Sequence, residues 1–431
     1  MPTPTATADA PARRGALHGL RRFWQALGPG LITGAADDDP SGIATYTIAG
    51  AQLGTGMLWT AFITWPLMGA VQNMCARIGM VTGRGLAAAF RLKLPRPVLV
   101  AAVVGLLAAN TINVGADLAG MADAAAMLSG ISSHFWVFLF AVLISWATVR
   151  FRYHQIANTL KWLALVLFAY VAAAFVIRVD WHDALRNTVV PRIPQGKLGW
   201  QTLVAILGTT ISPYLFFWQA SQEVEEEKHK GRHTVHQRRG ATRREIRTRR
   251  MDVGTGTFFS NLVMYFIILV AAFTLHRAGV TNIETSHEAA SALRPLAGNL
   301  AFLLYTVGIV GVGLLAIPTL TGSAAYAFAE TFGWKQGLDQ RLRRARSFYT
   351  VILISTAIGV ILDFTHFSAV QALYWSAVIN GLLAPFLLVG ILLVASDRKL
   401  MNGQPSSWLS RVAVGATAVA MFGAAIAMFV L

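Results

Sequence analysis

Eleven apolar runs, most of them about as long as a membrane-spanning helix, dominate this sequence of 431 residues. A helix needs roughly 20 apolar residues to cross a hydrocarbon core about 30 Å thick. Because lipid offers no partner to free backbone groups, such runs are expected to be helical, and the chain is predicted to be an all-α polytopic membrane protein. The runs lie near residues 29–52, 57–79, 97–121, 134–150, 156–178, 200–220, 253–276, 298–329, 348–362, 369–395 and 410–430.

The composition agrees with this prediction. Hydrophobic residues make up 55% of the chain and charged residues only 13%, whereas a soluble domain has about 25% charged residues. A soluble enzyme, a coiled coil and a disordered scaffold are therefore excluded. The net charge of +16 does not indicate a nucleic-acid partner, because the basic residues are strung between the apolar runs. The single cysteine, Cys75, excludes a disulfide framework within one chain.

The basic residues also orient the spans. Cytoplasmic loops of membrane proteins carry an excess of Lys and Arg, and most of these residues fall on one side when the spans alternate from a cytoplasmic N-terminus. Residues 1–26 lack the apolar core of a signal peptide and are expected to form a disordered cytoplasmic tail. We therefore expect a plasma (inner) membrane protein with its C-terminus outside the cytoplasm and membrane lipid around its spans.

Polar residues interrupt the first span in the middle. Asp37, Asp38 and Asp39 are consecutive carboxylates at membrane depth, where each costs a few kcal/mol. Pro40 removes a backbone donor and disfavours helical geometry at the preceding residue, and Gly42 permits a sharp turn. The helix is therefore predicted to break here and to free backbone carbonyls. Carboxylates beside free carbonyls form an oxygen-rich site that suits a hard cation.

The sixth span repeats this interruption at Pro213, which follows the hydroxyl residues Thr209, Thr210 and Ser212. Five spans separate the two breaks, so the second set of five helices crosses the membrane in the opposite sense. This is the inverted-repeat arrangement of many secondary transporters, whose substrate sites lie where two discontinuous helices meet. The predicted parts are a first repeat at 27–178, a second repeat at 199–395 with a basic cytoplasmic loop at 221–252, and an eleventh helix at 410–431.

The same residues carry a family resemblance. The segment from Gly28 to Gly42, with Asp39-Pro40-Ser41-Gly42 at its end, and the segment from Thr209 to Tyr214 resemble the two metal-binding motifs of the NRAMP divalent-metal transporters. The resemblance implies the leucine-transporter fold with an added eleventh helix. In that family the motifs are Asp-Pro-Gly-Asn and Ala-x-x-Met-Pro-His, and the Asp, the Asn, the Met sulfur and the Ala carbonyl bind the ion.

This sequence keeps the Asp of the first motif and departs from the family elsewhere. Gly42 stands in place of Asn, Ser212 in place of Met, Tyr214 in place of His and Thr209 in place of Ala. A similar loss of Asn and Met is found in the NRAMP-related magnesium transporter branch. The resemblance thus implies an ion site at the following positions, with the last two as further candidates: Asp39, Gly42, Thr209, Ser212, Tyr214, Asp38 and Asn380.

These departures change the expected ion. A thioether is a soft ligand that favours transition metals, and its replacement by a hydroxyl leaves oxygen donors only. Mg²⁺ is usually bound by one or two carboxylates while it keeps several waters. We therefore expect Mg²⁺ as the substrate, with Mn²⁺ as a second substrate, and no cofactor. A chain of this kind needs no second copy to form the site, and the sequence leaves its oligomeric state open.

The replacement of His by Tyr bears on energy coupling. The family's His belongs to a polar network associated with proton movement, whereas a tyrosine with an ordinary pKa of about 10 cannot exchange protons near neutrality. We therefore expect uptake that does not depend on protons. Asp117 and Asp123, near the outer end of the third span, keep the alternative of a proton-coupled Mn²⁺ or Fe²⁺ importer open.

Further polar residues could line the ion pathway. Asn110, Asn113 and Asp117 share one face of the third span, where they could either line the pathway or form interhelical hydrogen bonds. Asp37 is expected to face the aqueous path, with direct ligation as the alternative. Asn380, in the middle of the tenth span, could contribute an amide to the site or serve packing.

Two other functional classes compete with a cation transporter. An organic-cation or amino-acid transporter could use the same fold, but three Asp and no embedded Lys or Arg at the break favour a metal cation. An intramembrane enzyme would need a motif such as His-Glu-x-x-His or Gly-x-Ser-x-Gly, and neither is present. The absence of a nucleotide-binding loop excludes an ATP-driven pump within this chain. A secondary transporter is therefore predicted, and not an enzyme.

Overall fold

The computed structural model describes residues 33–34, 36–151, 165–364 and 368–431, and these residues form helices joined by short connections, with no β-strand among them. The predicted tail at 1–26 and the first half of the fifth span fall outside the described residues. The helices are α3 (Pro40–Leu53), α4 (Leu58–Thr82), α5 (Leu86–Arg91), α6 (Arg96–Ser129), α7 (Ser133–Arg150), α9 (Phe168–Val176), α10 (Trp181–Val189), α11 (Gly196–Thr210), α12 (Pro213–His229), α13 (Val235–Arg238), α14 (Arg243–Ala271), α15 (Ser286–Ser291), α16 (Arg294–Ala297), α17 (Leu300–Phe332), α18 (Arg346–Leu362), α19 (Ala369–Ser396) and α20 (Trp408–Val430).

The predicted spans correspond to helices throughout the described residues. Seven helical segments are long and apolar enough to cross a membrane, and one of them comprises α11 and α12 together. The other predicted spans correspond to α3, α4, α9 and α18, which are shorter or more polar. The prediction of an all-α polytopic membrane protein is thus confirmed.

The first span is discontinuous, as predicted. Residues 33–34 and 36–37 are helical, residues 38 and 39 are not, and α3 then begins at Pro40. Asp39 has an extended backbone (φ −71°, ψ 171°), which is the conformation that a following proline favours. Proline suits the first position of a helix, because the missing N–H would have no intrahelical partner there. Asp39-Pro40 therefore ends one half-helix and starts the next.

The sixth span breaks in the same way. Helix α11 ends at Thr210, Ser212 is extended (φ −75°, ψ 130°), and Pro213 occupies the first position of α12. The two breaks thus share one local design, an extended residue followed by a proline at the start of a helix. The structure confirms discontinuous helices in the first and sixth spans.

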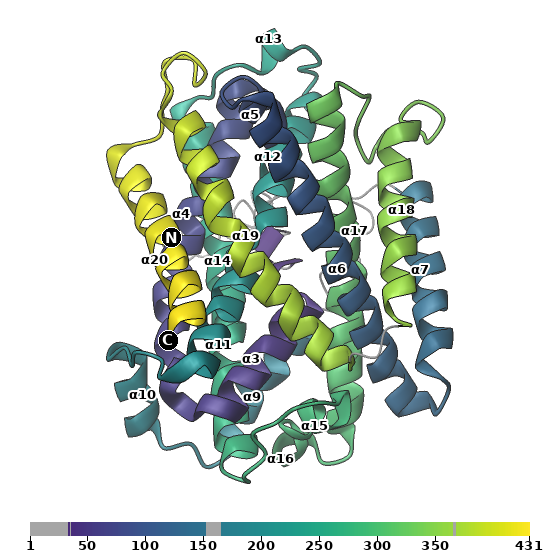
Figure 1. The fold of residues 1–431 in the computed structure, drawn as a ribbon, viewed down its shortest axis with the longest axis vertical. Coiled ribbons are helices and arrows are strands. Elements are labelled where there is room, and N and C mark those ends of the chain that lie inside the picture. The colour runs from purple at the N-terminus through teal and green to yellow at the C-terminus, as the bar shows by residue number, and fades with distance from the viewer. Residues whose placement is uncertain (1–32, 35, 152–164, 365–367) are drawn as a thin grey trace, which may run out of the picture.

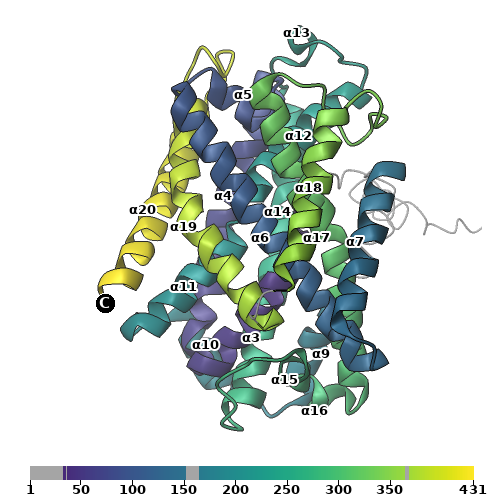
Figure 2. The ribbon, with the colours of Figure 1, turned by 45° about the vertical axis from the view of Figure 1, so that its right-hand side comes forward.

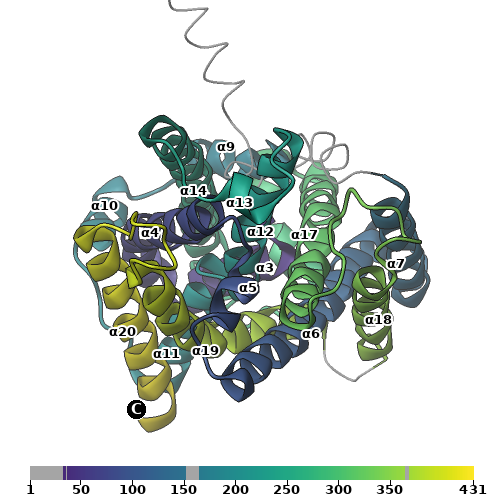
Figure 3. The ribbon, with the colours of Figure 1, turned by 90° about the horizontal axis from the view of Figure 1, so that it is seen from above.

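The broken helices lie inside the bundle. Figure 1 shows α3 behind α19 and next to α11, while α20 lies at one edge of the molecule and α7 and α18 lie at the other. Figure 2 shows α19 crossing in front of α3 and α11, and the view from above in Figure 3 places α3 and α12 near the centre. Both halves α3 and α12 are accordingly buried along most of their length.

Small residues allow the central helices to approach closely. A Cβ atom at Gly208 of α11 would lie 2.0 Å from the carbonyl oxygen of Ala377 in α19, and one at Gly381 of α19 would lie 2.3 Å from the carbonyl oxygen of Val204. Larger side chains at these two glycines would push the helices apart. The backbone next to the second break is therefore held directly against α19, in the manner typical of small residues between membrane helices.

One predicted segment is shorter in the structure. The sequence predicted a basic loop at 221–252, but α12 continues to His229 and α14 begins at Arg243, so only residues 230–242 connect the two long helices. Thr242 and Glu245 form a capping box that starts α14 earlier than the apolar run indicates. Charged residues can extend a helix beyond the apolar core of a membrane, which a count of apolar residues does not detect.

Candidate metal-ion site

Asp39 lies at the first break and is held in place by its own helix. Its Oδ1 accepts hydrogen bonds from the Ser41 hydroxyl at 2.6 Å and from the backbone N–H of Gly42 at 2.8 Å, so it caps the N-terminus of α3. A carboxylate suits this position because the N-terminal N–H groups of a helix lack intrahelical partners. The local contacts fix Oδ1 and leave Oδ2 to groups from other helices.

Asn113 of α6 connects the groups around Oδ2. Its amide nitrogen lies 3.3 Å from Oδ2 of Asp39 and 3.2 Å from Oδ2 of Asp117, so one amide donates to both carboxylates. Its amide oxygen accepts a hydrogen bond of 3.1 Å from the side chain of Asn380 in α19. The structure thus brings Asp39, Asn113, Asp117 and Asn380 into one network, although the sequence separates them widely.

Tyr214 of α12 joins the two breaks. Its hydroxyl donates a hydrogen bond of 2.8 Å to the carbonyl oxygen of Ala36, and the same hydroxyl lies 3.4 Å from Oδ2 of Asp39. The Ala36 carbonyl is one of those expected to lose its intrahelical partner at the break. The phenol of the second repeat therefore satisfies a free carbonyl of the first.

Thr209, at the end of α11, faces the start of α3. Its Oγ1 lies 3.5 Å from the Ser41 hydroxyl, and a Cβ atom at Gly42 would lie 3.1 Å from that Oγ1 and 3.6 Å from Oδ1 of Asp39. The absence of a side chain at Gly42 therefore lets the Thr209 hydroxyl lie close to the start of α3, beside the Asp39 carboxylate. The hydroxyl is an oxygen donor close to the position where the family motif has an amide.

Ser212 makes its contacts within the second break. Its hydroxyl lies 2.5 Å from the carbonyl oxygen of Thr209 and 3.0 Å from that of Gly208. The Ser212 hydroxyl thus stabilises carbonyls that lose their helical partners where α11 ends. One of them is the carbonyl of Thr209, a position expected to bind the ion. An ion at Thr209 would need this hydroxyl to turn away or to bind the ion as well.

Asp37 and Asp38 face a different helix. The hydroxyl of Ser260 in α14 lies 2.6 Å from Oδ2 of Asp37 and 3.0 Å from Oδ1 of Asp38, so one hydroxyl is shared between both carboxylates. Oδ1 of Asp37 is buried and has no hydrogen-bond partner among the described residues. Asp37 and Asp38 are therefore neighbours of Asp39 in the sequence, but their side chains contact a different helix.

The predicted pathway residue Asn110 and the acidic residue Asp123 lie outside this network. The Asn110 amide donates hydrogen bonds of 2.9 Å to the carbonyl of Leu320 and to the Ser323 hydroxyl in α17, which is the interhelical alternative considered from sequence. Asp123 accepts a hydrogen bond of 3.1 Å from the backbone N–H of Ser286 at the start of α15. Neither contact involves the groups around Asp39.

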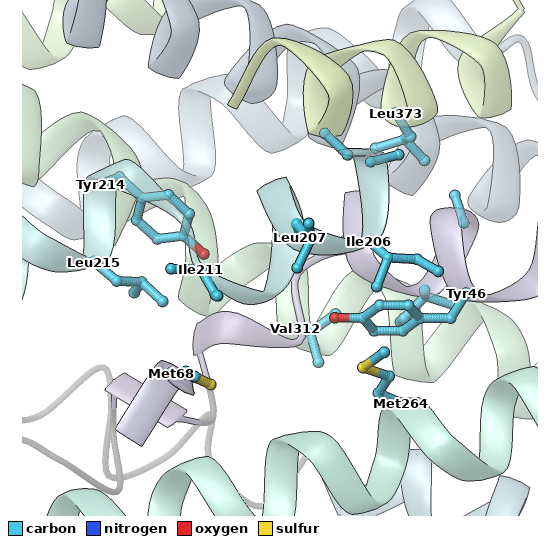
Figure 4. Close-up of a cluster of buried hydrophobic side chains, with 14 of the residues drawn as sticks. Tyr46, Met68, Ile206, Leu207, Ile211, Tyr214, Leu215, Met264, Val312 and Leu373 are labelled. Atoms are coloured by element: carbon cyan, nitrogen blue, oxygen red, sulfur yellow. The ribbon is translucent and has the colours of Figure 1, made fainter. Parts of the chain in front are cut away.

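Apolar side chains surround the breaks. Figure 4 shows Ile206, Leu207 and Ile211 of the α11 end between the rings of Tyr214 and Tyr46, with Met68 and Met264 nearby. The sulfur of Met68 lies 3.4 Å from the Asn261 amide, and that of Met264 lies 3.9 Å from the Thr64 hydroxyl.

The charge balance is the main chemical feature of the site. The four carboxylates Asp37, Asp38, Asp39 and Asp117 are at most 6% exposed, and within the described part of the chain none forms an ion pair with Lys, Arg or His. Buried charges are normally paired or bound to a metal ion. Four buried carboxylates at and beside the first break, without a cationic partner, are therefore suited to attract a cation.

The side chains that contact Asp39 carry hydroxyl and amide groups. In the portion of the chain that the structure describes, no three His, Cys, Asp or Glu side chains come together as a ligand set. The groups around Asp39 are hydroxyls, amides and backbone carbonyls. A resident transition-metal centre of the zinc type, with its N and S ligands, does not fit these residues.

Sequence reasoning missed two hydroxyls of the site. Ser41 is two residues after Asp39 and could have been found, because a hydroxyl there commonly bonds back to a preceding carboxylate. Ser260 lies in a span whose sequence gives no sign that it faces the first break. Contacts between distant helices of this kind depend on packing.

Two discontinuous helices that meet at a carboxylate are typical of the leucine-transporter fold. Solved structures show the same fold. A manganese transporter of Eremococcus coleocola is similar with a TM-score of 0.71 and 17% identity, over 96% of this chain and 95% of the other. The inward-facing conformation of Mhp1 is similar with a TM-score of 0.52 and 12% identity, over 93% and 89%.

The sequence comparisons identify the family. The model of the natural resistance-associated macrophage protein-like (Nramp) family matches residues 30–431. A divalent metal cation transporter MntH of Yersinia pestis is 30% identical over 69% of this chain and 71% of its own, and that of Verminephrobacter eiseniae is 26% identical over 91% and 86%. The chain belongs to the Nramp family, as the two motifs indicated. Its relatives are described as transporters, in agreement with the prediction that it is not an enzyme.

Proposed function

We propose that this protein carries divalent metal cations across a membrane by alternating access, with the ion bound at Asp39 between the two broken helices. The observation that carries the proposal is the group of buried carboxylates without a cationic partner. An anionic substrate would be repelled by this group. The names of the relatives, which describe divalent metal cation transporters, support the same substrate class.

We propose Asp39 as the charged ligand, with neutral oxygens from Thr209 and the freed carbonyls beside it. Gly42 lets the Thr209 hydroxyl lie beside Asp39, the Asn380 amide orients that of Asn113 towards Oδ2 of Asp39, and Tyr214 fixes the carbonyl of Ala36. Asp37, Asp38 and Asp117 add negative charge along the path. Ser212 would exchange its bond to the Thr209 carbonyl for the ion or its water.

The donor set favours Mg²⁺ as substrate, with Mn²⁺ also carried. Mg²⁺ prefers oxygen ligands and is usually held by one or two carboxylates while it keeps several waters, so a site with the Asp39 carboxylate and neutral oxygens suits this ion. Mn²⁺ shares much of this oxygen chemistry. The similar solved structure is titled a manganese transporter, and none of the relatives named above is described as carrying magnesium. A manganese importer is therefore the second candidate.

The transport would run without protons. Tyr214 donates to a backbone carbonyl and, unlike the histidine of the family motif, does not change its charge near neutral pH. Two charges that cross a potential of 100 mV gain about 4.6 kcal/mol, from about 2.3 kcal/mol per charge. The membrane potential is sufficient to drive uptake. The manganese alternative would instead use proton coupling, with Asp117 as the available carboxylate.

A binding experiment tests the site directly. Isothermal titration of the purified protein with Mg²⁺, Mn²⁺ and Ca²⁺ is expected to show one site for Mg²⁺ and Mn²⁺ that is lost in Asp39→Asn. The matched control is Asp123→Asn, because Asp123 contacts the start of α15 and lies outside the network. Unchanged binding in Asp39→Asn would contradict the assignment, and binding of Mn²⁺ without Mg²⁺ would favour the second candidate.

A further inference from the structure

A groove on the side of the bundle lies away from the ion site. It runs between α4, α14 and residues 405–410, which lead into α20, and has a volume of about 620 Å³. It reaches towards the end of the molecule that carries the basic segment 230–242. The groove is therefore placed where one leaflet of a membrane would meet the protein.

Two arginines line this groove without an acidic partner. Arg77 of α4 and Arg250 of α14 both line the groove, and no Asp or Glu side chain is among the described residues that line it. The Arg77 guanidinium donates to the neutral carbonyls of Gln404 and Pro405, at 3.2 to 3.3 Å. The pair therefore keeps a local positive charge.

A third arginine in the groove wall is already neutralised. Arg249 forms ion pairs with Glu223, Glu226 and Asp252, which lie behind it between α12 and α14. None of these carboxylates lines the groove, and within the described chain none forms an ion pair with Arg77 or Arg250.

The rest of the groove is apolar and exposed. Phe62, Trp65 and Pro66 of α4 follow one another at helical spacing, and Phe62 and Trp65 are 62% and 39% exposed. Residues 62 and 77 are 15 positions apart on one helix, which is about 22 Å at 1.5 Å per residue. Half of a bilayer with its headgroup region is about 20 to 22 Å thick. The groove thus matches one leaflet, with charge at the headgroup end and apolar side chains along its length.

We propose that this groove binds an anionic phospholipid, with its phosphate between Arg77 and Arg250 and an acyl chain along Phe62 and Trp65. The charge complementarity selects an anionic headgroup, and the apolar wall selects a lipid over a free anion. Basic pockets between transmembrane helices are known sites for anionic lipid headgroups. The bound lipid would connect α4 of the first repeat, α14 of the second and the segment before α20.

Native mass spectrometry of the purified protein can test this proposal. Titration with dioleoyl-phosphatidylglycerol and with dioleoyl-phosphatidylcholine is expected to give at least fivefold tighter binding of the first lipid. Arg250→Gln is expected to abolish this preference. Because Arg250 is exposed and forms no ion pair or side-chain hydrogen bond within the described chain, the variant is expected to fold. Arg77→Lys keeps the charge but loses the contact geometry, and is expected to retain part of the preference.

The matched control is Arg244→Gln, which removes an exposed arginine of the same helix outside the groove. Its lipid preference is expected to equal that of the wild type. Equal binding of both lipids, or an equal loss in Arg250→Gln and Arg244→Gln, would overturn the proposal. Inorganic phosphate is expected not to displace the lipid, and displacement at millimolar phosphate would overturn the lipid assignment in favour of a simple anion site.

Discussion

The hydroxyl of Thr209 occupies the edge of the space that a side chain at position 42 would need, because a Cβ atom added to Gly42 would lie 3.1 Å from its Oγ1. Glycine at one break and threonine at the other are therefore linked, because the Thr209 hydroxyl and a side chain at position 42 would compete for the same volume. In the family motif these positions hold Asn and Ala, a large and a small residue, so the two departures compensate for each other in volume.

This relationship predicts the behaviour of substitutions at Gly42. Gly42→Asn alone is expected to lower metal binding at least fivefold, because the new side chain meets the Thr209 hydroxyl. Gly42→Asn combined with Thr209→Ala restores the volumes of the family motif, and binding of Mn²⁺ is expected to recover. The measurement is calorimetric titration of both variants. Full binding in the single variant would show that the site adapts freely and that the link has no consequence.

Asp39 combines a charge with a helix cap, and two substitutions can separate these roles. Asp39→Asn retains a good cap and is expected to lose at least tenfold in ion affinity, about 1.4 kcal/mol. Asp39→Ala also loses the cap on Gly42 and is expected to be about 1 kcal/mol less stable than Asp39→Asn. Thermal unfolding in detergent and calorimetry distinguish the two effects. Equal stability of the variants would contradict the capping role.

Asn113 and Asn110 lie one helical turn apart in α6, but the structure gives them different partners. Asn113→Ala removes the amide that joins Asp39 and Asp117 and is expected to lower transport at least tenfold. Asn110→Ala leaves the carbonyl of Leu320 without this donor and is expected to cost about 1 to 3 kcal/mol of stability with transport largely kept. Uptake normalised to folded protein, together with the unfolding temperature, checks both. A loss of transport in Asn110→Ala with transport kept in Asn113→Ala would contradict these assignments.

Arg249 is 8% exposed and pairs with three carboxylates, two of them at 2.6 Å (Glu223) and 2.5 Å (Asp252). Arg249→Met is expected to lower stability by about 3 to 5 kcal/mol, because it leaves buried charge without its partner. Thermal unfolding in detergent measures the loss. A variant as stable as the wild type would show that the carboxylates find other partners.

The control for this prediction is Lys93→Met on the exposed ion pair with Asp397. The Lys93 ammonium holds the pKa of Asp397 below its usual range. The stabilisation that this ion pair gives is therefore present above the pKa that Asp397 has in the unfolded chain. It is lost as the pH falls through the lower pKa of Asp397 in the folded protein. Because solvent screens such a pair, the change in unfolding temperature at neutral pH is expected to be much smaller than for Arg249→Met.

The positions of the two breaks could be predicted because proline and aspartate are costly in an apolar helix. Asp39-Pro40 and Ser212-Pro213 interrupt runs that are otherwise typical of transmembrane helices, and the structure breaks both helices there. The motifs also carried enough information to indicate the family. These features depend on local sequence, which explains why they could be identified without a structure.

Other features depend on which helix faces which and could not be predicted. Nothing in the sequence indicates that the Ser260 hydroxyl contacts Asp37 and Asp38. Nor does it indicate that Asn113, and not Asn110, contacts Asp39. The length of α12 and α14 was also underestimated, because Arg249 and its carboxylates stabilise charged helical turns that an apolar count excludes. Such contacts arise from packing between segments that are distant in the chain.

The central claim is that a divalent cation binds at Asp39 while it crosses the membrane and that its transport is not coupled to protons. Uptake into proteoliposomes under an inside-negative potential, with Mg²⁺, Mn²⁺ or Ca²⁺ outside and a pH dye inside, tests it most directly. The account predicts entry of Mg²⁺ and Mn²⁺ without acidification, abolished in Asp39→Asn. Entry of Mn²⁺ with acidification and no flux of Mg²⁺ would contradict it and would establish a proton-coupled manganese importer.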